Sequence, residues 1–266
     1  MTPNILSIAG SDPSGGAGIQ ADIKAISANR GYAMAAITAL TAQNTRGVSG
    51  VQLVDPGLVA AQIDTVFADI RVDAVKIGML GSAEIATAVA GTLARHRPRH
   101  VVLDPVMIAK GGDRLLADAA ITVLRERLLP LATVLTPNLP EAAALLGEQE
   151  PGSRDAMPAM AAALRALGPD AVLLKGGHLP GGASPDLLCT AGGDTWYEAE
   201  RVATRNTHGT GCTLSSALAT RLAVTGDILL ATEQAKRYIA GAIAAADQLD
   251  VGHGHGPTHH FHALWR

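Results

Sequence analysis

Short apolar runs alternate along the chain with longer segments in which apolar residues recur every third or fourth position. The short runs are apolar at consecutive positions, which is typical of parallel strands that are buried on both faces. They predict strands at 4–9, 33–42, 74–77, 100–103, 134–135, 171–174, 187–190 and 195–198. The last two flank Gly192 and Gly193 and are expected to form a hairpin.

The longer segments predict helices, because apolar residues three and four positions apart share one helix face. These helices are expected at 19–30, 58–70, 83–96, 117–128, 139–146, 158–167, 210–224 and 229–249. The alternation of strands and helices predicts an α/β fold whose mostly parallel central sheet is covered on both faces. There is no repeat, charge block or linker, so we expect one domain over residues 1–266.

Polar and glycine residues recur where the predicted strands end. In a parallel sheet these carboxyl ends lie along one edge, and ligands bind beyond that edge. Each residue alone also fits an ordinary loop or helix cap, but their recurrence favours a phosphate-handling site. The residues are Gly10-Ser11-Asp12, Gln43-Asn44, Gly78-Met79, Asp104-Pro105, Asn138 and Lys175-Gly176-Gly177.

A second signal is the stretch 203–218, in which a glycine-rich turn runs directly into a predicted helix. The first amides of a helix have no intrahelical acceptor, and the helix dipole adds partial positive charge there. Such a turn is a candidate phosphate site, although an ordinary glycine turn before an amphipathic helix fits the pattern too. Cys212 begins this helix, where a thiol is expected to have a lowered pKa. The alternative for Cys212 is a small buried side chain.

Composition narrows the class of protein. Hydrophobic residues make up 48% of the chain, which is enough for a sizeable core. The net charge is −3 without a basic run, so we expect no nucleic-acid partner. Two cysteines give neither a disulfide framework nor zinc-site spacing. The chain has no signal-peptide pattern and no apolar run of membrane-spanning length, so we expect a cytoplasmic protein without a membrane partner.

Two other motifs carry less weight. Residues 16–21 fit the dinucleotide pattern G-x-G-x-x-A, but a dinucleotide oxidoreductase should carry an acid where Gln43 or Asn44 stands. The five histidines of the C-terminal tail have no standard metal-site spacing, so a solvated or packed tail is the preferred interpretation. Neither a glycine–lysine phosphate loop nor the HExxH or GxSxG motif occurs.

A phosphoryl-transfer site uses the remaining residues well, because that chemistry depends on positioning and on donors aimed at the phosphoryl group. The amides of 209–212 would supply donors, and Lys175 would neutralise phosphate charge. Asn138 and Glu141 would help to place magnesium, which prefers oxygen ligands. Cys212 would take the proton of an acceptor hydroxyl.

The chain resembles the hydroxymethylpyrimidine/phosphomethylpyrimidine kinases of thiamine biosynthesis, which belong to the ribokinase-like superfamily. The resemblance extends in order over essentially the whole chain. It rests on AGSDPSGGAGIQADIK (9–24), TALTAQNTRGV (38–48), VKIGML (75–80), LDPVM (103–107), LTPNLPEA (135–142), LLKGGH (173–178), NTHGTGCTLSSA (206–217) and the GPTHHFH tail.

The resemblance implies a three-layer α/β/α fold, ATP with Mg²⁺, and phosphorylation of 4-amino-5-hydroxymethyl-2-methylpyrimidine and then of its monophosphate. It implies that Gln43 reads the aminopyrimidine, since an amide offers both an acceptor and donors. Further substrate-binding residues would be Gly10, Asp22, Met79 and Val106. Nucleotide-binding residues would be Lys175, Asn138, Thr207, Gly209 and Gly211, and metal-binding residues Asp104 and Glu141. The catalytic set would be Cys212, Gly209, Thr210, Gly211 and Lys175.

Most ribokinase-like enzymes carry aspartate where this chain has Cys212. The acceptor in the second step is already an anionic phosphate, so we expect Cys212 to matter more in the first step. Superfamily resemblance implies a homodimer, and we expect no fused thiamine-phosphate synthase domain. The segments 10–18 and Ile108–Arg114 are lid candidates, because a lid must hinge and exclude water.

Pyridoxal kinase is the nearest alternative, because its substrate is also a six-membered nitrogen ring with a hydroxymethyl group. A non-catalytic ligand-binding protein on the same scaffold is the alternative from another class. That alternative predicts loss of Lys175, Asn138, Glu141 or the GTG turn, and all of them are intact.

Overall fold

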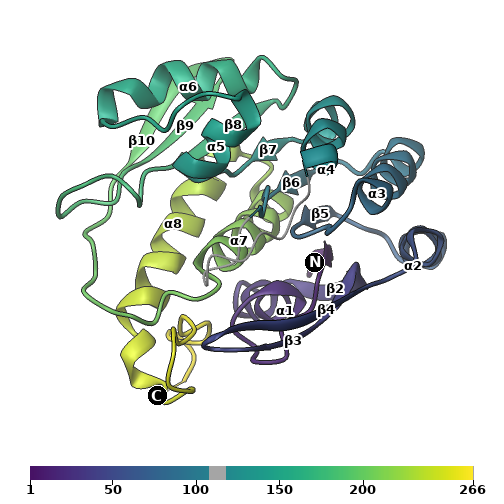
Figure 1. Ribbon diagram of the computed structural model, residues 1–266, viewed down its shortest axis with the longest axis horizontal. Helices are drawn as coiled ribbons and strands as arrows, with labels where there is room; N and C mark the ends of the chain where they lie inside the picture. Colours follow the sequence, from purple (N-terminus) through teal and green to yellow (C-terminus); the bar gives the residue numbers. More distant parts are fainter. Residues whose placement is uncertain (108–117, 266) are drawn as a thin grey trace.

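The computed structural model describes residues 1–107 and 118–265. Over these residues, the central sheet has eight strands in the order β10-β9-β8-β7-β6-β5-β1-β2 (Figure 1). All neighbouring strands are parallel except the pairs β8–β9 and β9–β10. The strands are β1 (Asn4–Ala9), β2 (Tyr32–Ile37), β5 (Ala74–Ile77), β6 (Val101–Leu103), β7 (Val134–Leu135), β8 (Ala171–Lys175), β9 (Asp186–Thr190) and β10 (Gly193–Tyr197).

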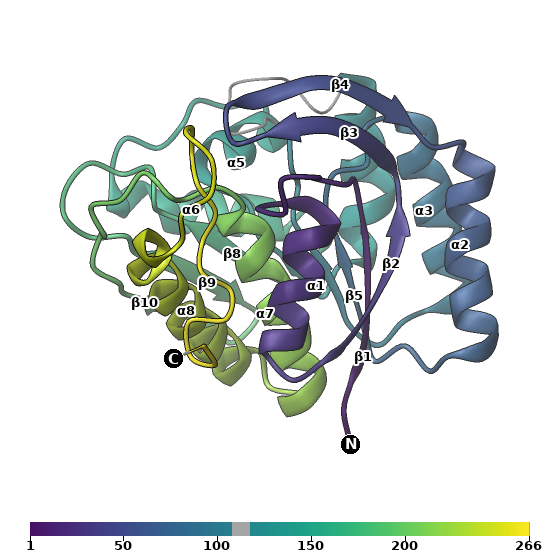
Figure 2. The same ribbon diagram turned by 90° about the horizontal axis from the view of Figure 1, so that it is seen from below.

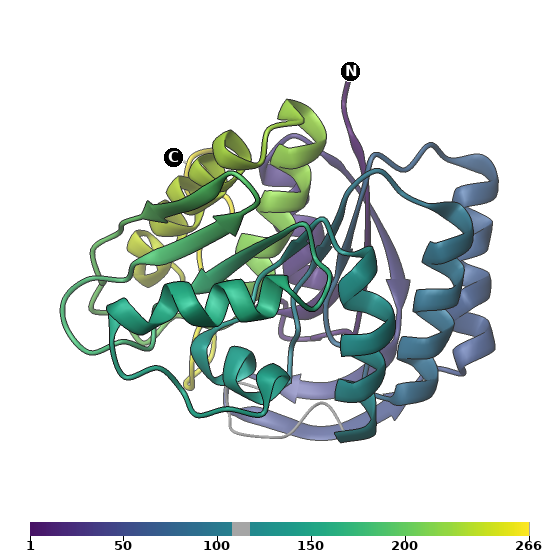
Figure 3. The ribbon, with the colours of Figure 1, turned by 90° about the horizontal axis from the view of Figure 1, so that it is seen from above.

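Helices cover both faces of this sheet, which confirms the predicted three-layer α/β/α fold. One face carries α1 (Gly18–Ala28), α7 (Thr210–Thr225) and α8 (Ile228–Ala244), as Figure 2 shows. The opposite face carries α2 (Pro56–Asp69), α3 (Ala83–His96), α4 (Asp118–Val123), α5 (Leu139–Leu146) and α6 (Met157–Arg165), seen in Figure 3. Short helical turns follow at Leu124–Leu128, Leu129–Leu131, Arg154–Ala156 and Ala246–Gln248.

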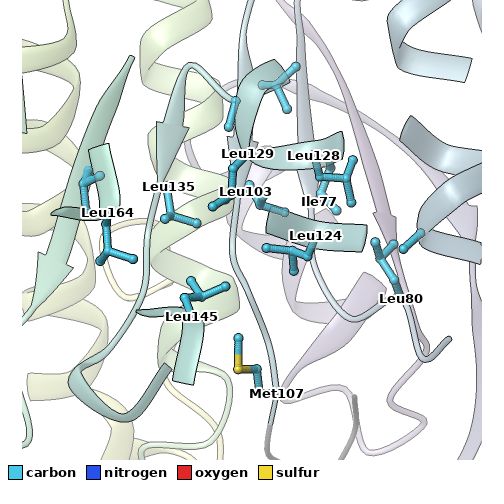
Figure 4. Close-up of a cluster of buried hydrophobic side chains, with 14 of the residues drawn as sticks. Ile77, Leu80, Leu103, Met107, Leu124, Leu128, Leu129, Leu135, Leu145 and Leu164 are labelled. Carbon is cyan, nitrogen blue, oxygen red and sulfur yellow. The ribbon is translucent and has the colours of Figure 1, made fainter. Parts of the chain in front are cut away.

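The core forms two apolar layers, one on each side of the sheet. Successive strand residues point to opposite faces, so Ile5 joins the layer under α7 and α8 while Leu6 joins the other. The larger layer includes Ile77, Leu103 and Leu135, packed against Leu124 and Leu128 (Figure 4). Burial on both faces explains why the strand sequences are apolar at consecutive positions.

The predicted strand 33–42 is wrong. β2 ends at Ile37, and the chain leaves the sheet at Thr38, whose hydroxyl donates to the Met79 carbonyl at 2.7 Å. The next residues form β3 (Ala39–Asn44), which pairs in antiparallel fashion with β4 (Gly47–Leu53), a strand that we did not predict. We call β3 and β4 the flap. Its residues are partly exposed, so their pattern lacks the continuous apolar character of buried strands.

Most other predictions are confirmed with small shifts at the ends. The strands 4–9, 74–77 and 134–135 and the helices 83–96 and 139–146 have the predicted bounds. The last helix ends at Ala244 rather than at residue 249, and a short helical turn follows it. The predicted helix 117–128 is α4 followed by a π-helical turn, and residue 117 lies outside the described residues. The lid candidate Ile108–Arg114 also lies outside them.

The C-terminal tail packs against the rest of the protein, as the preferred interpretation predicted. It reaches the flap (Figure 2). There, the His255 amide donates to the Thr45 carbonyl at 2.8 Å. His259 and His260 are buried, and burial lowers the pKa of His260 to about 3. In the described part of the chain, no group of three or more His, Cys, Asp or Glu residues could hold a metal ion. No helix there is long and apolar enough to span a membrane.

Candidate active site

A cavity of about 1060 Å³ opens at the carboxyl edge of the sheet. The ends of β1, β6 and β8, the flap and the start of α7 all contribute to its wall. The structure therefore brings together nearly all the residues that the sequence analysis selected. Those in the cavity wall are Gly10, Gln43, Met79, Asp104, Val106, Asn138, Glu141, Lys175, Thr207, Gly209, Thr210, Gly211 and Cys212.

The glycine-rich turn forms the predicted start of α7. Gly209 is the residue before the helix and has a φ of +74°, and a Cβ there would collide with the carbonyl oxygen of Gly16. Only glycine fits this conformation next to the 10–18 loop. The helix then runs for 16 residues, so the positive end of its dipole favours an anion in the cavity.

A charged cluster faces this turn. Lys175 Nζ lies 3.1 Å from Asp104 Oδ1 and 3.9 Å from Glu141 Oε2. A Cβ on Gly211 would lie 3.4 Å from both Asp104 Oδ2 and Lys175 Nζ, so the cluster is next to the helix start. Burial alone would lower the pKa of Lys175, but Asp104 and Glu141 raise it above its usual value. The lysine is therefore a fixed cation beside the candidate anion site.

Asn138 and Glu141 also cap α5. The Glu141 amide donates to Asn138 Oδ1 and the Asn138 amide donates to Glu141 Oε2, each at 2.8 Å. These two bonds form a capping box, so Asn138 and Glu141 also have the helix-capping role that the sequence allowed for residues at the strand ends. Burial, together with the nearby Asp104 carboxylate, raises the pKa of Glu141 to about 7, although Lys175 opposes the shift. Glu141 is thus poised to titrate near neutral pH.

The expected low pKa of Cys212 is wrong. Burial raises the pKa of this thiol to about 11; the Lys76 ammonium lowers it, but Asp22 and Asp104 raise it further. The Gly18 amide also lowers it without reversing the shift. The helix start alone suggested a thiolate, whereas the surroundings of this partly buried side chain favour the neutral thiol. Its place in the cavity wall is as predicted.

Gln43, Gly10, Met79 and Val106 form another part of the cavity wall. A Cβ on Gly10 would lie 2.6 Å from Met79 Cε, so the glycine leaves room for the methionine. Gln43 comes from the flap rather than from the end of a central strand. Its Oε1 lies 3.3 Å from the Thr41 hydroxyl, which donates to the Ser11 carbonyl at 2.9 Å. The amide thus faces the cavity from a separate two-stranded element.

Asp22 is elsewhere. Among the described residues, those that line the cavity do not include it. Its carboxylate is completely buried and lies 2.9 Å from Lys76 Nζ, and it accepts hydrogen bonds from the hydroxyls of Ser7 and Ser216. Its oxygens already accept these bonds in the core, so the structure gives direct substrate binding by Asp22 no support, and that role stays a prediction. The sequence could not show that Lys76 would fold against it.

The sequence analysis missed a buried pair between Asp12 and His208, whose Oδ2 and Nε2 lie 2.7 Å apart. Both residues line the cavity. Asp12 lies in the glycine-rich 10–18 loop, and His208 immediately precedes the Gly209–Gly211 turn. The sequence analysis also missed Lys236, which lines the same cavity and bonds to Asp186 at 2.7 Å. The available signal for Lys236 was a lysine on the apolar face of its helix, close to Ala235 and Ile239.

Comparisons with known proteins agree with this geometry. Residues 12–259 match the family described as phosphomethylpyrimidine kinase. A relative from Salmonella typhimurium, a hydroxymethylpyrimidine/phosphomethylpyrimidine kinase, is 54% identical over 98% of both chains. The structure of Bacillus subtilis pyridoxal kinase in complex with ADP is 37% identical, with a TM-score of 0.92 over 100% of both chains. The phosphomethylpyrimidine kinase from Clostridium difficile is 42% identical, with a TM-score of 0.81 over 91% of this chain and 100% of that one.

Proposed function

The chain belongs to the phosphomethylpyrimidine kinase family and is a phosphotransferase, and we propose that it phosphorylates 4-amino-5-hydroxymethyl-2-methylpyrimidine. The product of the first step would be phosphorylated again to give the diphosphate used in thiamine biosynthesis. One observation carries this proposal: an anion-binding turn, a buried lysine cluster and the Gln43 amide share one cavity. Phosphoryl transfer needs this combination of oriented donors and a fixed cation.

The phosphate end of the reaction would use Lys175 and the first turn of α7. The amides of Gly211 and Cys212 lie in the first turn of α7 and would donate to a phosphate, and Lys175 would add a positive charge there. The Asp186–Lys236 pair and the apolar Ile239 and Ile243 line another part of the cavity wall, where the rest of ATP would fit.

Magnesium suits the donor set. Asp104 presents a carboxylate beside Lys175, and Glu141 adds a second carboxyl group that is ionised above about pH 7. One or two carboxylates together with phosphate oxygens and water are the usual environment of protein-bound Mg²⁺. When bound, the ion would neutralise phosphate charge. The hydroxyls of Ser215 and Thr136 lie 3.3 and 3.4 Å from the Asp104 oxygens and would help to hold the carboxylate in place.

The pyrimidine would lie between Gln43 and Met79, with Cys212 near its hydroxymethyl group. Gln43 can accept from the amino group and donate to the adjacent ring nitrogen. Cys212 would receive the proton of the hydroxyl as the oxygen attacks phosphorus. Because its pKa is about 11, the thiol must first lose its own proton, which makes this step dependent on pH.

Pyridoxal is the second candidate acceptor. The Bacillus subtilis structure, which superimposes over the whole chain, is of a pyridoxal kinase. The test is a phosphoryl-transfer assay with ATP and Mg²⁺ that offers the hydroxymethylpyrimidine, its monophosphate and pyridoxal side by side. Turnover of both pyrimidines with poor turnover of pyridoxal supports the proposal. Turnover of pyridoxal alone refutes the pyrimidine assignment, and nucleotide binding without turnover of any acceptor favours a non-catalytic protein.

The proposal includes a cytoplasmic homodimer. The flap exposes the apolar side chains of Leu40, Val51 and Leu53, which supports the packing of a second copy of the chain on it. Analytical ultracentrifugation of the wild type and of Val51→Lys tests this assignment. A monomeric wild type would contradict it.

A further inference from the structure

His208 connects three parts of the candidate site. It immediately precedes the Gly209–Gly211 turn, and its side chain is buried in the cavity wall. Its Nε2 lies 2.7 Å from Asp12 Oδ2 and 3.5 Å from Gln43 Nε2. None of the roles assigned above uses this ring.

Asp12 fixes the direction of the hydrogen bond. Its Oδ1 accepts from the amide and the hydroxyl of Ser14, and its Oδ2 accepts from the Ala17 amide at 2.8 Å. Burial alone would raise the pKa of Asp12, but the bonds from His208 and Ser14 outweigh it and hold the pKa below its usual value. An ionised carboxylate only accepts, so His208 Nε2 must carry the proton and donate it.

This assignment affects Gln43. Because His208 Nε2 donates to Asp12, it has no lone pair to offer the Gln43 amide nitrogen. The two nitrogens 3.5 Å apart are then both donors, and the contact is not a hydrogen bond between them. The ring instead limits the positions that the Gln43 side chain can occupy and leaves its N–H groups to an acceptor in the cavity. At the other end of the amide, Gln43 Oε1 lies 3.3 Å from the Thr41 hydroxyl, whose shorter bond goes to the Ser11 carbonyl at 2.9 Å.

The backbone around His208 is held as firmly as the ring. The His208 amide donates to the Gly256 carbonyl at 3.0 Å, and the Gly256 amide donates to Asn206 Oδ1 at 3.1 Å. The same tail bonds to Thr45, at the turn of the flap. The tail therefore joins the flap that carries Gln43 to the segment that carries His208.

We propose that His208 is a positioning residue for acceptor recognition: its bond to Asp12 locks the 10–18 loop against the α7 turn and orients Gln43 toward an aminopyrimidine. This inference rests on the proposed function. His208 touches no reacting atom in this scheme. Its loss should weaken binding of the pyrimidine far more than binding of the nucleotide.

The test uses titration calorimetry with the full chain. The ligands are the hydroxymethylpyrimidine and, separately, a non-hydrolysable ATP analogue. His208→Leu removes the donor, His208→Gln restores an N–H at a similar reach, and His253→Leu, an exposed tail histidine, is the matched control. We expect His208→Leu to weaken pyrimidine binding by about tenfold or more. Without the bond to Asp12, part of the binding free energy must be used to order the site around the ligand. Nucleotide binding should change little, and His208→Gln should recover most of the pyrimidine affinity.

Asp12→Asn provides a second variant if His208→Leu folds poorly, which thermal unfolding will show. The double variant His208→Leu/Asp12→Asn should bind the pyrimidine no more weakly than the more damaging single variant, because both substitutions remove the same bond. Equal weakening of both ligands, or failure of His208→Gln to recover, would show a merely structural role. An unchanged pyrimidine affinity in His208→Leu would overturn this inference alone. No pyrimidine binding by the wild type would overturn the proposed function and this inference with it.

Discussion

Lys76 and Asp22 form an ion pair that is completely buried beneath the candidate site, with Lys76 Nζ 2.9 Å from each carboxylate oxygen. Burial alone would lower the pKa of Lys76, but Asp22 raises it above its usual value. Neighbouring hydroxyls from β1 and α7 complete the network, as Ser7 and Ser216 both donate to Asp22. The pair therefore links β5, α1, β1 and α7 at the place where these elements meet.

Replacing only one member of this pair should reduce the free energy of unfolding more than replacing both. Lys76→Met leaves an uncompensated buried carboxylate, so we expect a loss of about 3–5 kcal/mol in the free energy of unfolding. The double variant Lys76→Met/Asp22→Leu removes both charges and should lose less than the single variant. Denaturant unfolding at pH 7 measures both. Equal losses in the single and double variants would show that the buried charge is not the cause.

Cys212 should make the first phosphorylation depend on pH. With a pKa of about 11, its thiolate is present in about one molecule in ten thousand at pH 7. If the thiolate accepts the hydroxyl proton, the single-turnover rate should rise about tenfold per pH unit between pH 7 and 9. Cys212→Ala should lower that rate by about 10²-fold and flatten the profile.

The second phosphorylation supplies the internal control for Cys212. Its acceptor is already anionic, so Cys212→Ala should affect this step much less. The other cysteine, Cys189, is buried in the core of the sheet, and Cys189→Ala is the matched variant for any effect on folding. Unchanged first-step turnover in a folded Cys212→Ala variant would exclude the thiol as the base.

Gln43 should determine affinity for the pyrimidine. Gln43→Leu removes the amide that would pair with the amino group and ring nitrogen, so KM for the pyrimidine should rise. KM for ATP should stay nearly unchanged, because the nucleotide would occupy another part of the cavity. Gln52→Leu, an exposed glutamine on the other strand of the flap, is the control for general damage. Equal increases in both KM values would mean that the pyrimidine lies elsewhere.

Glu141 should make stability fall as pH rises through the weakly acidic range. Its folded pKa of about 7 lies above the unfolded value of 4.5, so the folded state binds the proton more tightly. The associated stability is complete below about pH 4.5 and is lost as pH rises to about 7. Glu141→Gln keeps an acceptor for the Asn138 amide but cannot ionise, so it should remove this part of the pH dependence.

Calorimetric unfolding at pH 5 and pH 8 measures the effect of Glu141→Gln. The difference in stability between the variant and the wild type should be more favourable to the variant at pH 8 than at pH 5. Glu148→Gln, an exposed position just beyond α5, should not change the difference between the two pH values. The same slope in the wild type and in Glu141→Gln would assign the pH dependence to another group.

Local pattern was sufficient for much of the fold. The apolar run of β1 and the capping sequence at Asn138 specify their own secondary structure, so their bounds were predicted. The flap was not predicted, because only Thr38 separates β2 from β3, and no glycine, proline or polar run marks a turn there. The pairing shows where the chain turns away from the sheet: Ile37 still pairs with Ala9 of β1, whereas Ala39 pairs with Leu53 of β4.

The sequence by itself determined the α/β layers and most of the residues that line the cavity. Parallel strands place their carboxyl ends along one edge of the sheet, and a glycine-rich turn before a helix presents its amides wherever it folds. Only the tertiary structure decided the protonation of Cys212, the place of Asp22 and the bond between His208 and Asp12. These depend on burial and on partners distant in the chain: 54 residues separate Lys76 from Asp22, and 196 separate His208 from Asp12. A pKa or a hydrogen bond is set by the atoms around a group, and those atoms are brought there by packing.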